Sequence, residues 1–284
     1  MILIFGASGF LGNYLSVFLL KGGYKVESAS RNDFYHENGK WKIAVHLAQK
    51  LQDATTVINC IALTDLTECE NNVEKSMMVN EKFPIHLSTL LPRSTHLIHL
   101  SSDAMYESKK NFSNENAEIF ISNIYAAHKL NAENCISNHL NTTVLRTSFL
   151  GYNHRNSGMV NHLLDSINQG KEIFGWNDAF TSSLHISHLS RIISLIITSP
   201  IQGIFNAGTL LPYSKFEFLE SLAAKLDHSA KIISITAPNT NKLLRNKNLG
   251  MDATKLFHKL KFQGWTIDDV VRETFNEIKY FVKL

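Results

Sequence analysis

Two tyrosine–lysine pairs in this chain have a spacing that suits acid–base chemistry. Tyr125 and Lys129 lie four residues apart in NIYAAHKLNAE, and Tyr106 and Lys110 lie four apart in MYESKK. On a helix, side chains at positions i and i+4 are neighbours. An ammonium beside a phenol stabilises the phenolate and lowers the pKa of the phenol from its usual value of about 10. The tyrosine then donates and accepts protons near neutral pH.

The residues around each pair decide between them. Tyr125 is followed by AAHKLNAE, whose Ala, Lys, Leu and Glu residues favour a helix. Tyr106 lies in SDAMYESKKNFSNEN, which is rich in turn-forming and polar residues and disfavours one. We therefore predict that Tyr125 and Lys129 are catalytic, and that Tyr106 and Lys110 are loop residues. Ser102 ends the apolar run THLIHLSS, and its hydroxyl is our candidate to bind the same substrate oxygen.

The first thirty residues predict a nucleotide site. The apolar run MILIF is followed by GASGFLG, by the amphipathic run NYLSVFLLKGG and by a second strand, KVESAS. Glycines between a strand and a helix let the backbone approach a pyrophosphate, whose charge then lies at the helix N-terminus. The alternative is a glycine-rich turn without a ligand. The predicted cofactor-binding residues of this turn are Gly6, Ser8, Gly9, Phe10, Leu11 and Gly12.

The end of the second strand bears on which nicotinamide cofactor binds. It reads Ser30, Arg31 and Asn32, where a carboxylate would bind the adenosine ribose hydroxyls of NADH. A guanidinium favours a 2′-phosphate through charge-assisted hydrogen bonds. We therefore expect NADPH as the cofactor, with NADH possible, because Asp33 is close and Arg31 has the alternative of a solvated loop residue.

Strands and helices alternate through the first half of the chain. Further apolar strands are predicted at 55–63, 95–102 and 142–151, and MMVNEKFPIHLSTLL reads as a helix that starts late, after Pro84. This alternation predicts an α/β fold: a Rossmann-type, doubly wound parallel sheet with a smaller C-terminal substrate-binding lobe. The predicted NAD(P)-binding domain spans 1–151 and is rejoined by about 184–208. The predicted lobe comprises 152–183 and 209–284.

Composition excludes several other classes. The net charge of +3 is too small to require a nucleic acid partner. Three cysteines form no CxxC pair, the histidines form no metal-binding spacing, and apolar runs are too short to span a bilayer. We expect a cytoplasmic protein with no metal and no membrane partner.

The assembled motifs resemble those of extended short-chain dehydrogenases/reductases, and within that superfamily they are most similar to dTDP-4-dehydrorhamnose reductases. The resemblance runs nearly end to end. It rests on GASGFLG, VINCIALTDLTECE with a later VN, LSSDAMY, YAAHK and LRTSFLGY, and more weakly on INQGKEIFGWNDAFTSSLHISHLSRII, GIFNAGT with its following YSKFEFL, and LLRNKNLGMDATKL.

The resemblance implies a role for each matching residue. Tyr125 donates the proton, Lys129 lowers the pKa of Tyr125 and holds the nicotinamide ribose, and Ser102 orients the ketone. Other matching positions are implied to bind ligands. They are Ile61, Ala62 and Leu63 for the cofactor and Asp103 and Phe149 for the sugar. The resemblance also implies that the C-terminal lobe binds the nucleotide diphosphate. Arg245 and Lys247 are our candidate contacts there, with a solvated basic loop as the alternative.

The chain also departs from its relatives. Phe149 replaces the family's Trp, His188 replaces an Asp, and WKIAVHLAQKL offers His46 and Leu47 at the third strand, where the family has an Asp near the adenine. Ala104 stands where related dehydratases carry Glu and where the GDP-fucose synthase type carries Cys. Dehydration and that kind of epimerisation therefore lack their acid–base group.

Simple ketone reduction remains as the leading expectation. The predicted reaction is NADPH-dependent reduction of the 4-keto group of a nucleotide-linked 4-keto-6-deoxy sugar, for deoxysugar or polysaccharide biosynthesis, by a possible homodimer. One alternative is a non-catalytic, NADP-binding regulatory subunit that resembles that of methionine adenosyltransferase. The other is a nucleotide-sugar epimerase with tightly held NAD.

Overall fold

The computed structural model describes residues 1–29, 33–37, 40–107, 112–137, 141–153, 158–226, 230–238 and 246–282. These residues form two compact units. The first unit comprises Met1–Ser102, Ile121–Arg146 and Ser190–Phe205, and the second comprises Asp103–Phe120, Thr147–Leu189 and Asn206–Leu284. The chain therefore crosses from one unit to the other several times, and each unit is described below by itself.

The first unit is built on a six-stranded sheet with the strand order β12-β7-β6-β5-β1-β2. The pairings among β2, β1, β5, β6 and β7 are parallel. Apolar side chains fill the inner strands because helices cover both faces of such a sheet. The strands are β1 (Ile2–Phe5), β2 (Val26–Ala29), β5 (Thr56–Asn59), β6 (His96–Leu100), β7 (Thr142–Thr147) and β12 (Gly203–Ala207).

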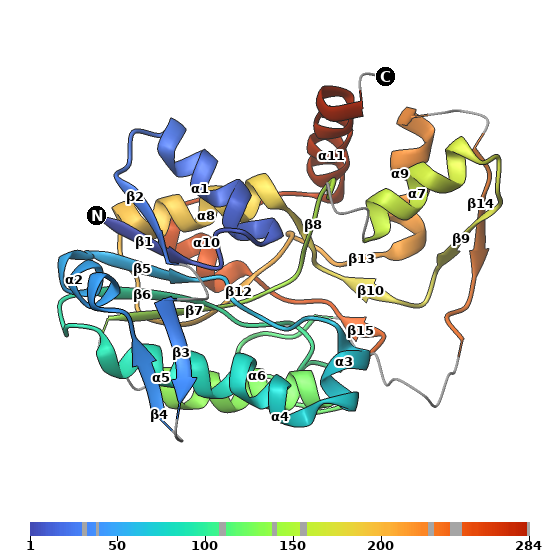
Figure 1. Cartoon of the computed structure of the whole chain (residues 1–284). Helices are drawn as coiled ribbons and strands as arrows, with labels where there is room; N and C mark the ends of the chain where they lie inside the picture. Colours follow the sequence, from blue (N-terminus) through green and yellow to red (C-terminus); the bar gives the residue numbers. More distant parts are fainter. Residues whose placement is uncertain are drawn as a thin grey trace. The chain divides into compact units, whose positions relative to one another are not determined.

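Helices lie on both faces of this sheet (Figure 1). On one face, Leu3 and Phe5 pack with Leu47 and Leu51 of α2 and with Phe83 of α5. Helices α5 and α6 lie on that side, and α1 and α8 lie on the other (Figure 1). The helices of this unit are α1 (Phe10–Lys21), α2 (Val45–Asp53), α3 (Leu66–Asn71), α4 (Val73–Met77), α5 (Phe83–Leu90), α6 (Ile124–Ile136) and α8 (Ile186–Thr198). The first turn of α8 belongs to the second unit.

Two local predictions were wrong. The segment WKIAVHLAQKL is not the third strand of the sheet: β4 (Lys40–Ile43) forms an antiparallel hairpin with β3 (Phe34–Glu37), and α2 follows. The helix that was expected to start after Pro84 begins at Val73, and a π-helical turn, Met78–Lys82, joins α4 to α5. Pro84 is tolerated inside this helical run because it lies just after the π-helical turn. There the N–H of Phe83 donates to the carbonyl oxygen of Met78, five residues back, so the regular i→i−4 pattern is interrupted.

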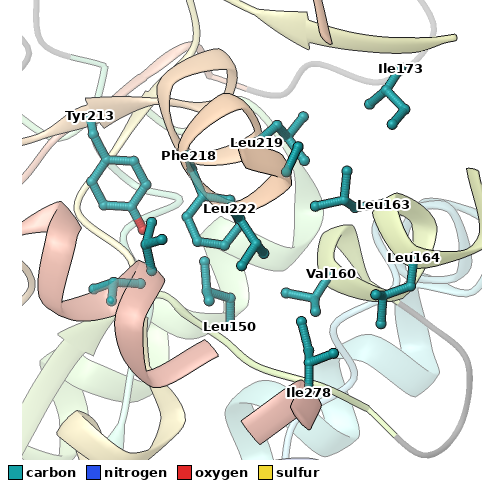
Figure 2. Packing of buried hydrophobic residues seen from close by; sticks show 13 residues of the cluster. Leu150, Val160, Leu163, Leu164, Ile173, Tyr213, Phe218, Leu219, Leu222 and Ile278 are labelled. Atoms are coloured by element: carbon teal, nitrogen blue, oxygen red, sulfur yellow. The ribbon is translucent and has the colours of Figure 1, made fainter. Parts of the chain in front are cut away.

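The second unit has a core of its own, in which α7, α9 and α11 pack around Leu150 of β8 (Figure 2). Phe218 and Leu222 of α9 lie at its centre. The helices are α7 (Met159–Asn168), α9 (Lys215–Leu226), α10 (Thr254–Leu260) and α11 (Ile267–Val282). The strands are β8 (Phe149–Leu150), β9 (Ile173–Trp176), β10 (Phe180–Thr181), β11 (Leu184–His185), β13 (Tyr213–Ser214), β14 (Ile232–Ile235) and β15 (Asn248–Leu249).

The six-stranded, doubly wound sheet, together with the smaller sheets of the second unit, confirms the predicted fold class. The units divide the chain at residues other than the predicted domain boundaries, since 103–120 lies within the predicted domain 1–151 but packs in the second unit. Among the described residues, none of the helices has both the length and the apolar composition that crossing a bilayer requires.

Candidate active site

Tyr125 and Lys129 lie on the buried face of α6. Asn123 caps this helix, because its side-chain oxygen accepts a hydrogen bond from the N–H of Ala126 at 2.8 Å. Tyr125 is 9% exposed and Lys129 is 1% exposed. The predicted helical register therefore exists, and it presents the phenol and the amine from neighbouring turns.

Polar contacts from neighbouring elements fix α6 in place. The Glu70 carboxylate of α3 accepts a hydrogen bond from the N–H of Ile124 at 2.7 Å, where the helix dipole favours a negative charge. At the other end, Glu133 forms a buried ion pair with Arg146 of β7, in which Arg146 Nε lies 3.1 Å from both carboxylate oxygens. Tyr125 and Lys129 are thus carried by a helix whose two ends both bind neighbouring elements.

Lys129 reaches the carboxyl end of β6. Its ammonium donates a hydrogen bond to the carbonyl oxygen of Leu100, and its Nζ lies 3.4 Å from Nε2 of His99. Burial lowers the pKa of Lys129 to about 8, and the nearby Glu133 opposes that shift. The amine therefore titrates close to neutral pH.

Ser102 follows the same strand end. The N–H of Ser101 extends the pairing of β6 with β7 by donating to the carbonyl oxygen of Leu145 at 2.7 Å, and Ser102 comes next, 5% exposed. Because Lys129 binds the carbonyl of Leu100, two residues earlier, Ser102 and α6 adjoin at one edge of the sheet. Ligands of doubly wound sheets bind at this edge.

The glycine turn leaves room for a phosphate group. Gly6 has a φ of +84°, a conformation that favours glycine, and the N–H of Gly9 donates to the carbonyl oxygen of Gly6 at 2.9 Å. A Cβ on Gly12 would lie 2.2 Å from that oxygen. Gly9 is the N-cap of α1 and has no side chain to occupy the helix terminus. These residues fit a dinucleotide pyrophosphate.

The other predicted residues of the turn differ in exposure. Ser8 is exposed, Phe10 is partly buried, and Leu11 is 5% exposed and belongs to the core. Leu11 can therefore contribute its backbone N–H to a cofactor, while its side chain anchors α1.

The side chains of two buried asparagines form hydrogen bonds with the backbone of the loop after β5. The side-chain oxygen of Asn59 accepts from the N–H of Ile61 at 3.0 Å. Asn80, in the π-helical turn, accepts from the N–H of Leu63 at 2.9 Å and donates to its carbonyl oxygen at 3.0 Å. Ala62, between them, is exposed. This arrangement fixes the loop that the resemblance assigns to the cofactor. The loop lies next to Gly6, because a Cβ added to Gly6 would lie 3.1 Å from Ile61.

Asp103 and Phe149 belong to the second unit. Asp103 is 6% exposed, and its carbonyl oxygen accepts from the N–H of Tyr106 at 2.9 Å. Phe149 is partly buried in β8, which pairs with β11. Lys247 forms an ion pair with Asp178 at 2.9 Å, so its charge is balanced inside the unit.

His188 has a packing role in the second unit. Its ring stacks on Trp265, with the centroids 4.3 Å apart and the planes 12° from parallel. An aromatic ring thus occupies the position where the resemblance expects an aspartate.

Tyr106 is the loop residue that the sequence predicts, but it is not at the surface. It is fully buried, and its hydroxyl donates to the side-chain oxygen of Asn206 at 2.9 Å. Asn206 in turn donates to the carbonyl oxygens of Ser113 and Asp252 at 2.8 and 3.1 Å. Tyr106 and Asn206 therefore join two segments of the second unit, Asp103–Phe120 and Asn206–Leu284. Lys110, the partner of Tyr106 in the YxxxK spacing, lies outside the described residues, as do Arg31 and Arg245.

Sequence reasoning missed three supporting residues. Asn59 is the last residue of β5, His99 is the residue paired with it in β6, and Asn80 lies in the π-helical turn. A polar residue inside an otherwise apolar strand was the available signal for the first two, because a buried polar group needs a partner. Among the described residues, no group of His, Cys, Asp or Glu side chains could hold a metal ion.

Comparison with known proteins places the chain among sugar-nucleotide enzymes. Residues 1–279 match the family described as RmlD substrate binding domain. The spore coat polysaccharide biosynthesis protein SpsK of Bacillus subtilis is 22% identical over 83% of this chain and 82% of its own length.

Two solved structures share the fold. A dTDP-4-dehydrorhamnose reductase from Bacillus anthracis, in complex with NADP, has a TM-score of 0.83 and 17% identity over 97% of this chain and 98% of its own. A UDP-glucuronic acid 4-epimerase from Bacillus cereus, in complex with UDP-glucuronic acid and NAD, has a TM-score of 0.77 and 18% identity over 98% and 99%. With the match across nearly its whole length, the chain belongs to the RmlD substrate-binding domain family of NAD(P)-dependent reductases, within the extended short-chain dehydrogenases/reductases.

Proposed function

We propose that this protein uses NADPH to reduce the 4-keto group of a nucleotide-linked 4-keto-6-deoxy sugar. The observation that carries the proposal is the buried Tyr125–Lys129 pair on α6, with the amine bound to the strand end that precedes Ser102. The name of the Bacillus subtilis relative supports a role in polysaccharide biosynthesis.

The chain's own residues supply the proton and the orientation. Tyr125 donates its phenolic proton to the carbonyl oxygen of the sugar, Ser102 donates a hydrogen bond to the same oxygen, and Lys129 stabilises the resulting phenolate. When bound, NADPH supplies the hydride for the carbonyl carbon. The glycine turn, with Gly12 against Gly6, would hold its pyrophosphate, and the loop from Ile61 to Leu63 would lie along its ribose.

Ala104 supports reduction over other chemistry on the same scaffold. A methyl group can neither take nor give a proton, so this position lacks the base that elimination or epimerisation of the sugar needs. From the resemblance, Asp103 and Phe149 are the candidates for contacts with the sugar, and Arg245 is the candidate for the nucleotide diphosphate.

The proposal is tested by incubating the pure protein with dTDP-, UDP-, GDP- and CDP-linked 4-keto-6-deoxy sugars and following NADPH absorbance. We expect NADPH to be consumed with at least one of them, and Tyr125→Phe to stop the reaction. If none of the four is reduced, the proposed function is wrong.

The same assay separates the two alternatives. A regulatory subunit would bind NADPH and consume none, and Tyr125→Phe would leave its association with a partner enzyme unchanged. An epimerase would retain NAD through purification and interconvert sugar nucleotides without net NADPH consumption. The NAD-bound epimerase of similar fold is the reason to include this measurement.

The preference for NADPH rests on Arg31, a sequence prediction. We expect Arg31→Ala to raise the KM for NADPH far more than the KM for NADH, because only NADPH carries the 2′-phosphate that a guanidinium would bind. An unchanged preference would exclude Arg31 from the cofactor site.

A further inference from the structure

A chain of buried polar groups leads from the loop after β5 to Lys129. The N–H of Ile61 donates to Asn59 Oδ1 at 3.0 Å, Asn59 Nδ2 lies 3.1 Å from His99 Nδ1, and His99 Nε2 lies 3.4 Å from Lys129 Nζ. The three side chains are at most 1% exposed. Water cannot therefore substitute for a missing partner, and the proton positions must be mutually consistent.

The backbone fixes the orientation of Asn59. The N–H of Ile61 is a donor, so the atom that faces it is the amide oxygen, and the NH₂ group points at His99. His99 Nδ1 must then accept. Burial, together with the charge of Lys129, holds the pKa of His99 well below its usual range, so the ring is neutral and carries one proton. That proton is on Nε2, which faces Lys129.

This tautomer suits one charge state of Lys129 better than the other. An ammonium has only N–H donors, so His99 Nε2–H meets it donor to donor, whereas a neutral amine has a lone pair that accepts the proton of Nε2–H. The amine form still donates to the carbonyl oxygen of Leu100. The polar network is therefore complete when Lys129 is uncharged.

We propose that His99, held by Asn59 as its Nε2–H tautomer, is a positioning residue that disfavours the ammonium form of Lys129. The inference rests on the proposed function in one respect. Ketone reduction consumes the phenolic proton of Tyr125, and a lysine that readily loses its charge leaves that phenol protonated until it donates. The phenolate that forms then favours the ammonium again.

Other charged and titratable groups near Lys129 do not produce this effect. Glu133, one turn further along α6, favours the ammonium, and its charge is shared with Arg146. Cys60, which follows β5, stays a neutral thiol because burial raises its pKa to about 12. His99 is the neighbour whose donor opposes the charge.

The test measures the pKa of Lys129 directly, with no substrate present. The ¹³Cε signal of Lys129 is followed with pH in protein labelled with [ε-¹³C]lysine and is assigned by its loss in Lys129→Met. His99→Gln offers the ammonium an amide oxygen. We expect it to raise the pKa of Lys129 by about one to two units, the difference that one hydrogen bond to a charged group makes.

His96→Gln is the matched control. His96 is a buried histidine of the same strand, and its Nε2 binds Thr143 at 2.8 Å. This substitution should leave the pKa of Lys129 unchanged. If His99→Gln also leaves it unchanged in folded protein, or if both substitutions raise it equally, His99 has no specific role.

A second measurement needs no variant. Long-range ¹H–¹⁵N spectra of the histidine rings report the tautomer of His99 in the wild-type protein, and an Nδ1–H ring would overturn the inference even if His99→Gln fails to fold. In an active enzyme, His99→Gln should also move the alkaline limb of kcat/KM to lower pH. Because both NMR measurements are made without substrate, their results test the role of His99 even if the protein reduces no sugar nucleotide.

Discussion

Removing the hydroxyl of Tyr106 should lower stability and leave catalysis intact. Tyr106 and Asn206 are both fully buried, and Tyr106→Phe leaves the side-chain oxygen of Asn206 without the donor that lies 2.9 Å away. An unsatisfied buried acceptor costs about 1–3 kcal/mol, so we expect the free energy of unfolding to fall by about that amount. Urea unfolding followed by tryptophan fluorescence measures it, because Trp176 and Trp265 belong to the same unit as Tyr106.

The same change at Tyr125 should have the opposite signature. Tyr125→Phe removes the proposed general acid, so kcat should fall by about 10²- to 10⁴-fold. Tyr106→Phe should keep kcat near the wild-type value. Tyr280→Phe, at a side chain that is 78% exposed, is the control and should change neither quantity. If Tyr106→Phe abolished turnover while the unfolding free energy stayed constant, the choice between the two tyrosine–lysine pairs would be wrong.

Three further substitutions probe the first unit. Gly12→Ala places a Cβ 2.2 Å from the carbonyl oxygen of Gly6. We expect this change to abolish NADPH binding, measured by fluorescence titration. Undiminished affinity would mean that this turn does not hold the cofactor. Glu133→Gln leaves the guanidinium of Arg146 buried without its counter-charge and should reduce the free energy of unfolding by about 3–5 kcal/mol in urea, whereas a loss under 1 kcal/mol would show that the pair is dispensable. The pKa of Lys129 is about 8 in the folded chain against 10.5 in the unfolded chain, so between these pH values the unfolded state binds more protons and stability rises with pH. The wild type should gain about 3 kcal/mol relative to Lys129→Met from pH 8 to 10.5, and parallel stability curves for the two proteins would contradict the lowered pKa.

Local patterns were enough to identify the fold and to place the proposed catalytic pair on one helix. The glycine turn between an apolar strand and a helix has few solutions, because only glycine tolerates the φ of Gly6 and the close approach of Gly12. The spacing of Tyr125 and Lys129 needed only a helix, and the surrounding residues favour one. Such signals are local, so the sequence alone carries them.

Two segments of the first unit, WKIAVHLAQKL and the helical run around Pro84, differ from their predicted structure. In WKIAVHLAQKL, strand-forming and helix-forming residues share one short segment, and tertiary packing of Leu47 and Leu51 against the sheet decides for a helix. A proline favours the first turn of a helix, yet the π-helical turn that precedes Pro84 accommodates this proline in a longer helical run. Propensity gives way here to packing.

By itself, the sequence determined the type of fold, and it predicted the nucleotide turn and the proposed acid with its lysine. Only the tertiary structure decided that Tyr106 is buried and hydrogen-bonded to Asn206 in the second unit. It also decided that Asn59 contacts His99 and that His99 contacts Lys129. The reason is that these contacts join residues from 30 to 100 positions apart, where no periodicity or spacing records them. Which groups face a buried amine, and hence its proton affinity, depends on how neighbouring strands and a crossing helix are packed.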